Sequence, residues 1–346
     1  MEGFLPWAVF ALSAAAVGMA GWQLARQGNR ISDQTGIGGL WVGAMLIAAA
    51  TSLPEIITDV SAAAIEEPNL AAGDLFGSSM ANMLILAVID LMHRRQRVLR
   101  TVSQGHGLVA MLAVALTVMA AAFIVSDSAL SIGHVGLETL VLAAVYLLGT
   151  RIVFQQEYVE ALARIAARTG ENRGEAEAQT MDEAQGLRLP ERATALRFLA
   201  AAAVIVAAGP LLALSAEGIS DQTGMEASFV GVLFLATTTS LPELISSVSA
   251  VRMGAHDLAV GNLFGSNCFN MAAFVFVDFA YTPGPIFDAV DRAEIVAALV
   301  AVFLMATAMM GIIYRAERRF WILEPDAAAI MIAYGLGLLM VYDAAT

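Results

Sequence analysis

ATSLPEI at residues 50–56 and TTSLPEL at residues 238–244 each place a proline and a glutamate in the middle of an apolar run. Proline inside a helix removes one backbone hydrogen bond and clashes with the carbonyl four residues earlier. A carboxylate at the centre of a membrane-spanning segment costs at least about 2.5 kcal/mol. Two copies of so costly a pair indicate a functional site.

The composition places these stretches in a membrane protein. Hydrophobic residues make up 59% of the 346 residues and charged residues only 14%, far from the balance of a soluble domain. A helix needs about 20 apolar residues to cross the hydrocarbon core. The chain accommodates ten such stretches, so we expect an all-α polytopic membrane protein with ten transmembrane helices. They lie at roughly 4–25, 38–64, 70–92, 105–125, 130–152, 194–214, 226–251, 258–281, 293–314 and 326–343.

The arginines predict the orientation. All 18 basic residues are Arg, and all but Arg292 fall in alternate loops or around the central polar segment, 155–192. By the positive-inside rule, these loops and the central segment are cytoplasmic and both chain ends are external. We therefore expect a multi-pass protein of the cell (inner) membrane. The net charge of −13 argues against nucleic acid as a partner, and the single Cys268 excludes an intramolecular disulfide.

The sequence also repeats itself. A shift of 188 positions aligns residues 31–91 with 219–279 without a gap, and 28 of the 61 pairs are identical. The period contains five expected crossings, an odd number, so the second copy is inverted relative to the first. We expect two inverted five-helix repeats, 1–154 and 193–346, joined by a cytoplasmic linker, 155–192. Inverted repeats with interrupted helices are typical of secondary transporters, whose substrates bind at the repeat interface.

The repeated segments carry oxygen ligands and no thiolate or histidine pair. Thr51 and Ser52 share a helix face with Glu55, and the second copy repeats this arrangement. Such a set suits hard cations. Two carboxylates balance one Ca²⁺ or two Na⁺, and a pre-built oxygen cage favours Ca²⁺ over Mg²⁺, which keeps its waters. The candidate ligands are Thr51, Ser52, Glu55, Ser78 and Asn82, their counterparts Thr239, Ser240, Glu243, Ser266 and Asn270, and the carbonyls of Ala48 and Ala236.

The paired TSLPE motifs, followed by GDLFGSSMAN at 73–82 and GNLFGSNCFN at 261–270, resemble the two alpha-repeats of prokaryotic-type sodium/calcium exchangers in the calcium/cation antiporter superfamily. The resemblance implies an antiporter, not an enzyme, that exchanges Na⁺ for Ca²⁺ across the lipid bilayer by alternating access and uses no cofactor. It implies a Ca²⁺ site at Thr51, Glu55, Thr239 and Glu243. It also implies Na⁺ sites at Ser52, Ser78, Ser240, Ser266 and the carbonyls of Ala48 and Ala236, with Asn82 and Asn270 nearby. Protein partners are not indicated.

The chain departs from the family pattern at several positions. No glycine precedes Thr51 or Thr239, and Asp74 and Ser79 stand where asparagines are usual. Some prokaryotic relatives carry an aspartate at the position of Asn270, and its absence makes proton coupling less favoured. An H⁺/Ca²⁺ antiporter, or one driven by another cation, stays open as an alternative. An intramembrane protease and a cation channel are more remote ones.

Four acidic residues and two glycines have expected structural roles. We expect Asp59 and Asp74 to be solvated or to line a vestibule, and Asp90 and Asp278 to cap the ends of their spans. Gly77 and Gly265 are expected to let helices approach closely.

Overall fold

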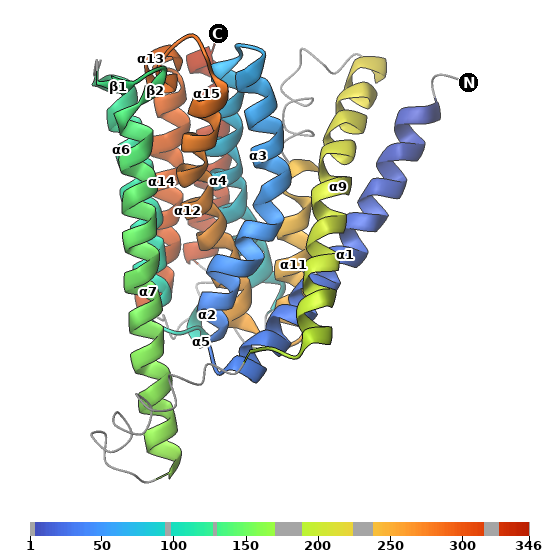
Figure 1. Ribbon diagram of the computed structural model, residues 1–346, viewed down its shortest axis with the longest axis vertical. Coiled ribbons are helices and arrows are strands. Elements are labelled where there is room, and N and C mark those ends of the chain that lie inside the picture. Colours follow the sequence, from blue (N-terminus) through green and yellow to red (C-terminus); the bar gives the residue numbers. More distant parts are fainter. Residues whose placement is uncertain are drawn as a thin grey trace.

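The computed structural model describes residues 4–93, 98–126, 130–169, 189–223, 238–314 and 325–345. Long helices run between two faces of the molecule (Figure 1). Nine helices in these ranges are long and apolar enough to cross a membrane, which confirms the all-α polytopic prediction. The remaining expected span, 226–251, begins outside the described residues and continues as α11.

Prolines mark where several helices begin. Pro6, Pro68 and Pro242 lie in the first turn of α1, α4 and α11, where the missing N–H has no intrahelical partner to lose. The elements in chain order are α1 (Leu5–Thr35), α2 (Gly39–Trp41), a π-helical turn (Val42–Ile47), α3 (Ala48–Ala64), α4 (Pro68–Met92), α5 (Val98–Thr101), α6 (His106–Val125), β1 (Ser131–Ile132), β2 (Val135–Gly136), α7 (Leu137–Thr169), α9 (Arg192–Thr223), α11 (Leu241–Arg252), α12 (His256–Ala280), α13 (Ile286–Ala289), α14 (Glu294–Tyr314) and α15 (Pro325–Ala345).

The fifth expected span differs most from the structure. Residues 131–136 form an antiparallel hairpin that turns at Gly133, whose φ of 70° suits glycine. Helix α7 starts only at Leu137 and continues to Thr169, well past the expected end at 152 and into the segment predicted as a linker. The reason is local, because residues 155–169 contain neither glycine nor proline and are rich in strong helix formers.

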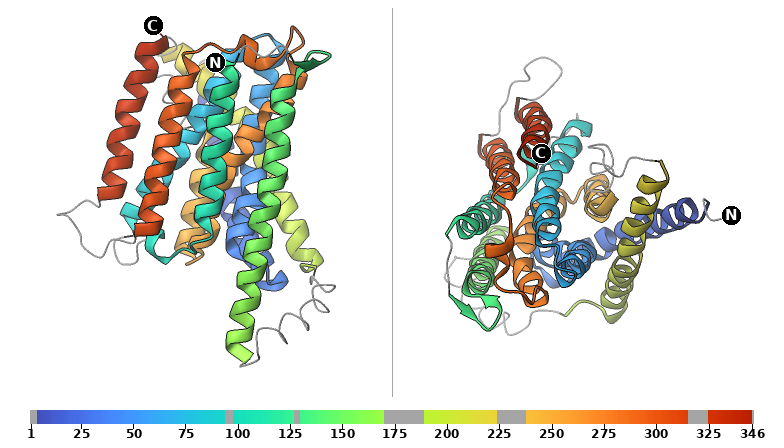
Figure 2. Two further views of the ribbon diagram at one scale, coloured as in Figure 1. Left: turned by 90° about the vertical axis from the view of Figure 1, so that its left-hand side faces the viewer. Right: turned by 90° about the horizontal axis from the view of Figure 1, so that it is seen from above.

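Helices α3, α4 and α12 occupy the centre of the bundle. In their apolar windows 67%, 72% and 72% of the residues are buried, against 22% in α7 and α15. Seen from above, α1 and α9 flank the centre on one side, and α6, α14 and α15 lie on the other (Figure 2). These three helices carry three of the four repeated motif segments, and the second TSLPE copy lies at the start of α11 (Leu241–Arg252).

Glycines bring α12 into backbone contact with the segment before α3. A Cβ on Gly261 would lie 2.6 Å from Leu40 O, and one on Gly265 would collide with the backbone of Ala44. The predicted close approach at Gly265 is therefore confirmed. For Gly77 no described atom lies within 4 Å of the position its Cβ would take, and the counterpart of the Ala44 segment, at the offset of 188, lies outside the described residues, so that expectation stays a prediction.

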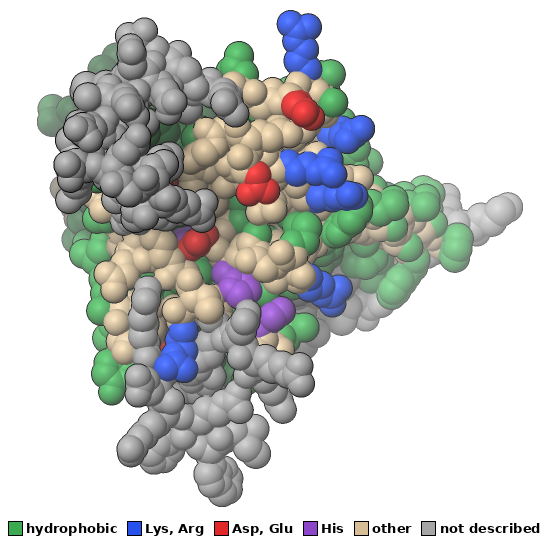
Figure 3. All heavy atoms as spheres, turned by 90° about the horizontal axis from the view of Figure 1, so that it is seen from below, with side chains coloured by type: hydrophobic (Ala, Val, Ile, Leu, Met, Phe, Trp, Pro, Cys, Tyr) green, Lys and Arg blue, Asp and Glu red, His purple; other side chains and the backbone are tan. Residues whose placement is uncertain are grey.

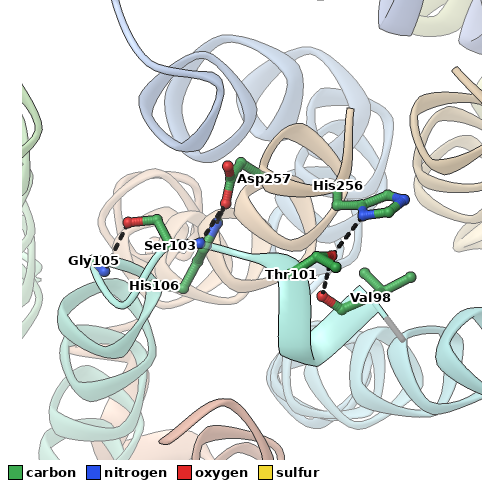
Figure 4. Close-up of polar contacts among 7 residues, drawn as sticks. All are labelled: Val98, Thr101, Ser103, Gly105, His106, His256 and Asp257. Atoms are coloured by element: carbon green, nitrogen blue, oxygen red, sulfur yellow. Dashed lines mark hydrogen bonds and ion pairs between the residues drawn. The ribbon is translucent and has the colours of Figure 1, made fainter. Parts of the chain in front are cut away.

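Polar tethers hold the start of α12 at the face from which α7 projects. Asp257 accepts hydrogen bonds from Ser103 N (2.7 Å) and His106 Nε2 (3.0 Å). His256 Nδ1 lies 2.6 Å from Thr101 Oγ1. Figure 4 shows these contacts joining the α5–α6 connection to α12. The first turn of α12 is thus fixed to a loop of the first half of the chain.

A matching tether holds the start of α4 at the opposite face. Asn69 Oδ1 accepts from Asp291 N (2.8 Å), and Asn69 Nδ2 donates to Asp291 Oδ2 (2.6 Å). The offset of 188 positions relates Asn69 to Asp257 and Ser103 to Asp291. Equivalent positions therefore make equivalent contacts at opposite ends of the molecule, as an inverted arrangement predicts.

Asp90 and Asp278 also occupy equivalent positions, near the ends of α4 and α12. Asp90 Oδ1 accepts from Leu99 N at 3.1 Å. Asp278 accepts from Gly136 N and Ile286 N, both at 2.8 Å, and from Thr139 Oγ1 at 2.6 Å. Each carboxylate thus bonds the chain that follows or covers its helix end, in agreement with the expected terminal role.

Replacing Asp278 by alanine should destabilise the fold without touching the ion path. Two buried N–H groups and one hydroxyl would lose their acceptor, so we expect the free energy of unfolding to fall by about 2–4 kcal/mol. Thermal unfolding in detergent measures this. Asp278→Asn keeps one acceptor oxygen, so its melting temperature should lie between those of the alanine variant and the unsubstituted protein. Equal melting temperatures for the alanine variant and the unsubstituted protein would contradict the tether.

Candidate ion-binding site

Two glutamates lie in the interior of the bundle. Glu55 on α3 is 2% exposed and Glu243 on α11 is fully buried. Their neighbouring prolines have different settings, since Pro54 lies inside α3 and Pro242 in the first turn of α11. Only Pro54 therefore interrupts a continuous described helix, and it deprives the Ala50 carbonyl of its helical N–H partner.

Hydroxyls from neighbouring helices reach both carboxylates. Ser78 Oγ on α4 donates to Glu55 Oε1 at 3.0 Å. Ser52 Oγ on α3 donates to Glu243 Oε1 at 3.3 Å. The second contact joins the two TSLPE motifs directly, so the motifs meet in one site although 188 residues separate them.

Several other polar atoms of this site have no hydrogen-bond partner in the part of the chain that the structure describes. Buried polar groups in proteins nearly always have one, and an unpaired group costs about 1–3 kcal/mol. An oxygen-rich cluster of this kind suits a hard cation, which would be bound by the carboxylates, hydroxyls and amide oxygens. The atoms are Glu55 Oε2, Glu243 Oε2, Ser240 Oγ, Ser266 Oγ, Asn82 Oδ1, and Oδ1 and Nδ2 of Asn270.

Two backbone carbonyl oxygens lie beside the Thr51 hydroxyl. Its Oγ1 lies 3.1 Å from Ile47 O and 3.3 Å from the Ala48 carbonyl. These carbonyls belong to the last residue of the π-helical turn Val42–Ile47 and to the residue after it. Such local widening of a helix occurs often at functional sites. The predicted Ala48 carbonyl therefore lies beside the predicted Thr51 hydroxyl.

The second copy of the motif is described from Thr238 onward. Thr239 lines a small cavity together with Pro54, Glu55 and Pro242. It therefore lies near Glu55, one of the two glutamates with which it was predicted to bind Ca²⁺. The Ala236 carbonyl, the counterpart of the Ala48 carbonyl, lies outside the described residues.

Nearly all of the predicted ligands thus converge on the three central helices and α11. Ser266 and Asn270, one turn apart on α12, are both fully buried, and the Asn270 amide faces Glu55. Among the described residues no group of three or more Asp, Glu, His or Cys side chains surrounds a common point. The predicted ligand set consists instead of two carboxylates with neutral oxygens.

Two asparagines of this region were not predicted. Asn262 Oδ1 lies 3.3 Å from Thr51 Oγ1, and its Nδ2 donates to Ser246 and Ser247, both at 3.0 Å. Asn267 Oδ1 accepts from Asn82 Nδ2 at 2.9 Å. The sequence did contain a hint of their importance. Asn262 and Asn267 occupy, in the second repeat, the positions of Asp74 and Ser79, where the first repeat departs from the family pattern.

The structure corrects the expectation for Asp59. Its side chain is 1% exposed, because this face of α3 packs against α4. It contacts Asp74, whose residue is only partly exposed and whose Oδ2 is buried. Neither residue is a freely solvated surface acid.

Comparison with known proteins identifies the family of this chain. The family described as "Sodium/calcium exchanger protein" matches residues 5–155 and 193–344. The chain therefore belongs to the sodium/calcium exchanger family. It is a cation/Ca²⁺ antiporter, a membrane transporter and not an enzyme.

Individual relatives support the assignment. The inner membrane protein YrbG of Escherichia coli is 30% identical over 259 residues, which cover 72% of each chain. The sodium/calcium exchanger MaX1 of Methanosarcina acetivorans is 40% identical over 52 residues, 15% of each chain. Solved structures of the sodium-calcium exchanger NCX_Mj superpose with a TM-score of 0.70 at 17% identity and cover 97% of this chain and 99% of that one. The last similarity establishes a shared fold.

Proposed function

We propose that this protein exchanges Na⁺ for Ca²⁺ by alternating access, with the ions bound between its two halves at Glu55 and Glu243. One observation carries the proposal: both carboxylates are buried, and each keeps one oxygen without a hydrogen-bond partner among the described residues. Neutral hydroxyl and amide oxygens surround them. Such a site needs positive charge from outside the protein.

The chemistry of the ligands favours Ca²⁺ and Na⁺ as the transported ions. Ca²⁺ takes six to eight oxygen ligands in flexible geometry, whereas Mg²⁺ retains its waters. One Ca²⁺ or two Na⁺ would neutralise the two glutamates. The Ca²⁺ ligands would be Thr51, Glu55, Thr239 and Glu243. The Na⁺ ligands would be Ser52, Ser78, Ser240, Ser266 and the carbonyls of Ala48 and Ala236, with Asn82 and Asn270 beside them.

The proposed moving parts are the two halves of the chain. We divide it into 1–154 and 193–346, with 155–192 as the connection. The matched tethers at opposite faces support an inverted relation between the halves, in which exchange of their conformations would open the site to one face and then the other. The contact of Ser52 with Glu243 spans the two halves, so ion binding would be sensitive to their relative position.

The proposed orientation in the membrane places both chain ends outside. Both described ends lie toward the face opposite the projecting end of α7 (Figure 2). Basic side chains are seen on the face from which α7 projects (Figure 3), and Arg192 and Arg252 lie at the first residue of α9 and the last residue of α11. By the positive-inside rule that side is cytoplasmic.

Cysteine labelling tests this orientation. Ile132 in the hairpin is 68% exposed and Leu189 is 89% exposed. A membrane-impermeant maleimide should label Ile132→Cys in intact cells and label Leu189→Cys only after the membrane is opened. The native Cys268 is buried, so it should stay silent. Equal labelling of the two positions in intact cells would contradict the topology.

Substituting either central glutamate tests the site. Glu55→Gln and Glu243→Gln keep the side-chain shape but remove half of the charge, so each should slow Ca²⁺ transport by about 100-fold, equivalent to about 2.8 kcal/mol. Uptake of radioactive Ca²⁺ into proteoliposomes measures this. Glu67→Gln, the same exchange on an exposed loop, is the control. Near-normal uptake by either central variant would make that glutamate structural.

One transport experiment tests both the identity of the coupling ion and the net charge that crosses the membrane in each exchange cycle. Besides the two carboxylates, two sets of hydroxyl and carbonyl oxygens are available, enough for a third Na⁺, and the neutral Asn82 and Asn270 would not cancel its charge. We expect internal Na⁺ to drive Ca²⁺ uptake, and an inside-positive potential to accelerate it, with about 2.3 kcal/mol per charge and 100 mV available.

Three results would separate the alternatives. Uptake driven by a pH gradient and indifferent to Na⁺ would establish proton coupling in place of sodium coupling. Sodium-driven uptake indifferent to voltage would remove the third Na⁺. Currents that persist without a counter-ion on the other side would indicate a channel.

A further inference from the structure

A second pair of acidic side chains lies beside the candidate ion-binding site. Asp59 is one helical turn beyond Glu55 on α3, and Asp74 is one turn before Ser78 on α4. The two carboxylates are close neighbours across the contact of α3 with α4. Because α3 ends and α4 begins at the face where the chain ends lie (Figure 1), the pair sits between that face and the glutamates.

Within the part of the chain that the structure describes, no basic group neutralises this pair. Asp59 is 1% exposed, and the Oδ2 atoms of Asp59 and Asp74 are buried without a hydrogen-bond donor among the described residues. No basic side chain of the described ranges forms an ion pair with either. Two carboxylates in contact cannot both stay ionised unless a positive charge lies close to them.

The other half of the chain shows that the fold does not require acids here. The counterparts of Asp59 and Asp74, at the offset of 188, are Ser247 and Asn262. Asn262 Nδ2 donates to Ser247 Oγ at 3.0 Å, a neutral and satisfied pair. In the first half both members are carboxylates, so the negative charge has a use other than packing.

Two further acidic residues, Asp291 and Glu294, lie near the start of α4, the helix that carries Asp74. The Glu294 carboxylate lies 3.3 Å from the position that a Cβ on Gly73 would take, and Gly73 adjoins Asp74. Asp291, which bonds Asn69 at the start of α4, lies three residues before Glu294. The surroundings of the start of α4 thus carry negative charge in addition to the buried pair.

We propose that Asp59 and Asp74 form a second cation-binding site, which takes a hard divalent cation such as Ca²⁺ before it reaches Glu55 and Glu243. Two carboxylates match the charge of one divalent ion, and water completes the coordination that Ca²⁺ requires. The direction of ion entry rests on the proposed function, but the existence of the site does not.

Equilibrium binding of radioactive Ca²⁺ to the purified full-length protein without Na⁺ tests the site directly. Glu55→Gln combined with Glu243→Gln should remove about one bound Ca²⁺ and leave another. Adding Asp59→Ser with Asp74→Asn should remove the remaining ion. These substitutions install the pair that the other half already carries, so the fold should accept them. Glu66→Gln with Glu67→Gln, on the exposed loop between α3 and α4, controls for general surface charge.

Transport supplies a second readout. In otherwise unsubstituted protein, Asp59→Ser with Asp74→Asn should raise the KM for Ca²⁺ at the outer face severalfold and leave the KM at the other face unchanged. The proposal is overturned if the double glutamine variant binds no Ca²⁺, if its bound Ca²⁺ survives the Asp59 and Asp74 substitutions, or if the loop control lowers binding equally. A change confined to the pH dependence of transport would place a proton between the two aspartates instead. If the unsubstituted protein did not transport Ca²⁺, only the proposed function would be contradicted. The second site is tested by Ca²⁺ binding to the double glutamine variant, which does not require transport.

Discussion

Negative charge buried in the middle of a lipid-embedded bundle dominates this structure. Glu55 and Glu243 are almost inaccessible, and the contacts that reach them come from hydroxyls, which orient a carboxylate without neutralising it. A lone buried charge of this kind costs several kcal/mol. The close backbone approach of α12 to the segment before α3 brings many oxygens near the two glutamates. The prolines add to this, Pro54 inside α3 and Pro242 in the first turn of α11.

Duplication of this arrangement is close but not perfect, and the differences are informative. The offset of 188 preserves the glutamates, the hydroxyls and the tethers at the helix starts, which serve both halves alike. It does not preserve the pair formed by Asp59 and Asp74, which becomes Ser247 and Asn262. An antiporter that faces different ion concentrations on its two sides has a reason to treat its two entrances differently, whereas its central site must serve both.

Much of this was predictable because the informative residues break the rules of their surroundings. A proline and a glutamate repeated in apolar runs located Glu55 and Glu243, and apolar length located the spans. The burial of Asp59, the cross-helix role of Asn267 and the widened turn at Val42–Ile47 were not predicted. In a membrane helix the lipid-facing and core-facing sides are both apolar, so the pattern carries little information on which face meets which neighbour.

The long helix α7 sets how the two halves of the chain are joined. Its 33 residues correspond to about 50 Å of helix at about 1.5 Å per residue, whereas the hydrocarbon core is about 30 Å thick. Since it starts at the face of the hairpin, some 20 Å of it extends past the far surface of that core, as its projecting end in Figure 1 illustrates. A protein or label attached at the C-terminal end of α7 would therefore sit at a distance from the bilayer.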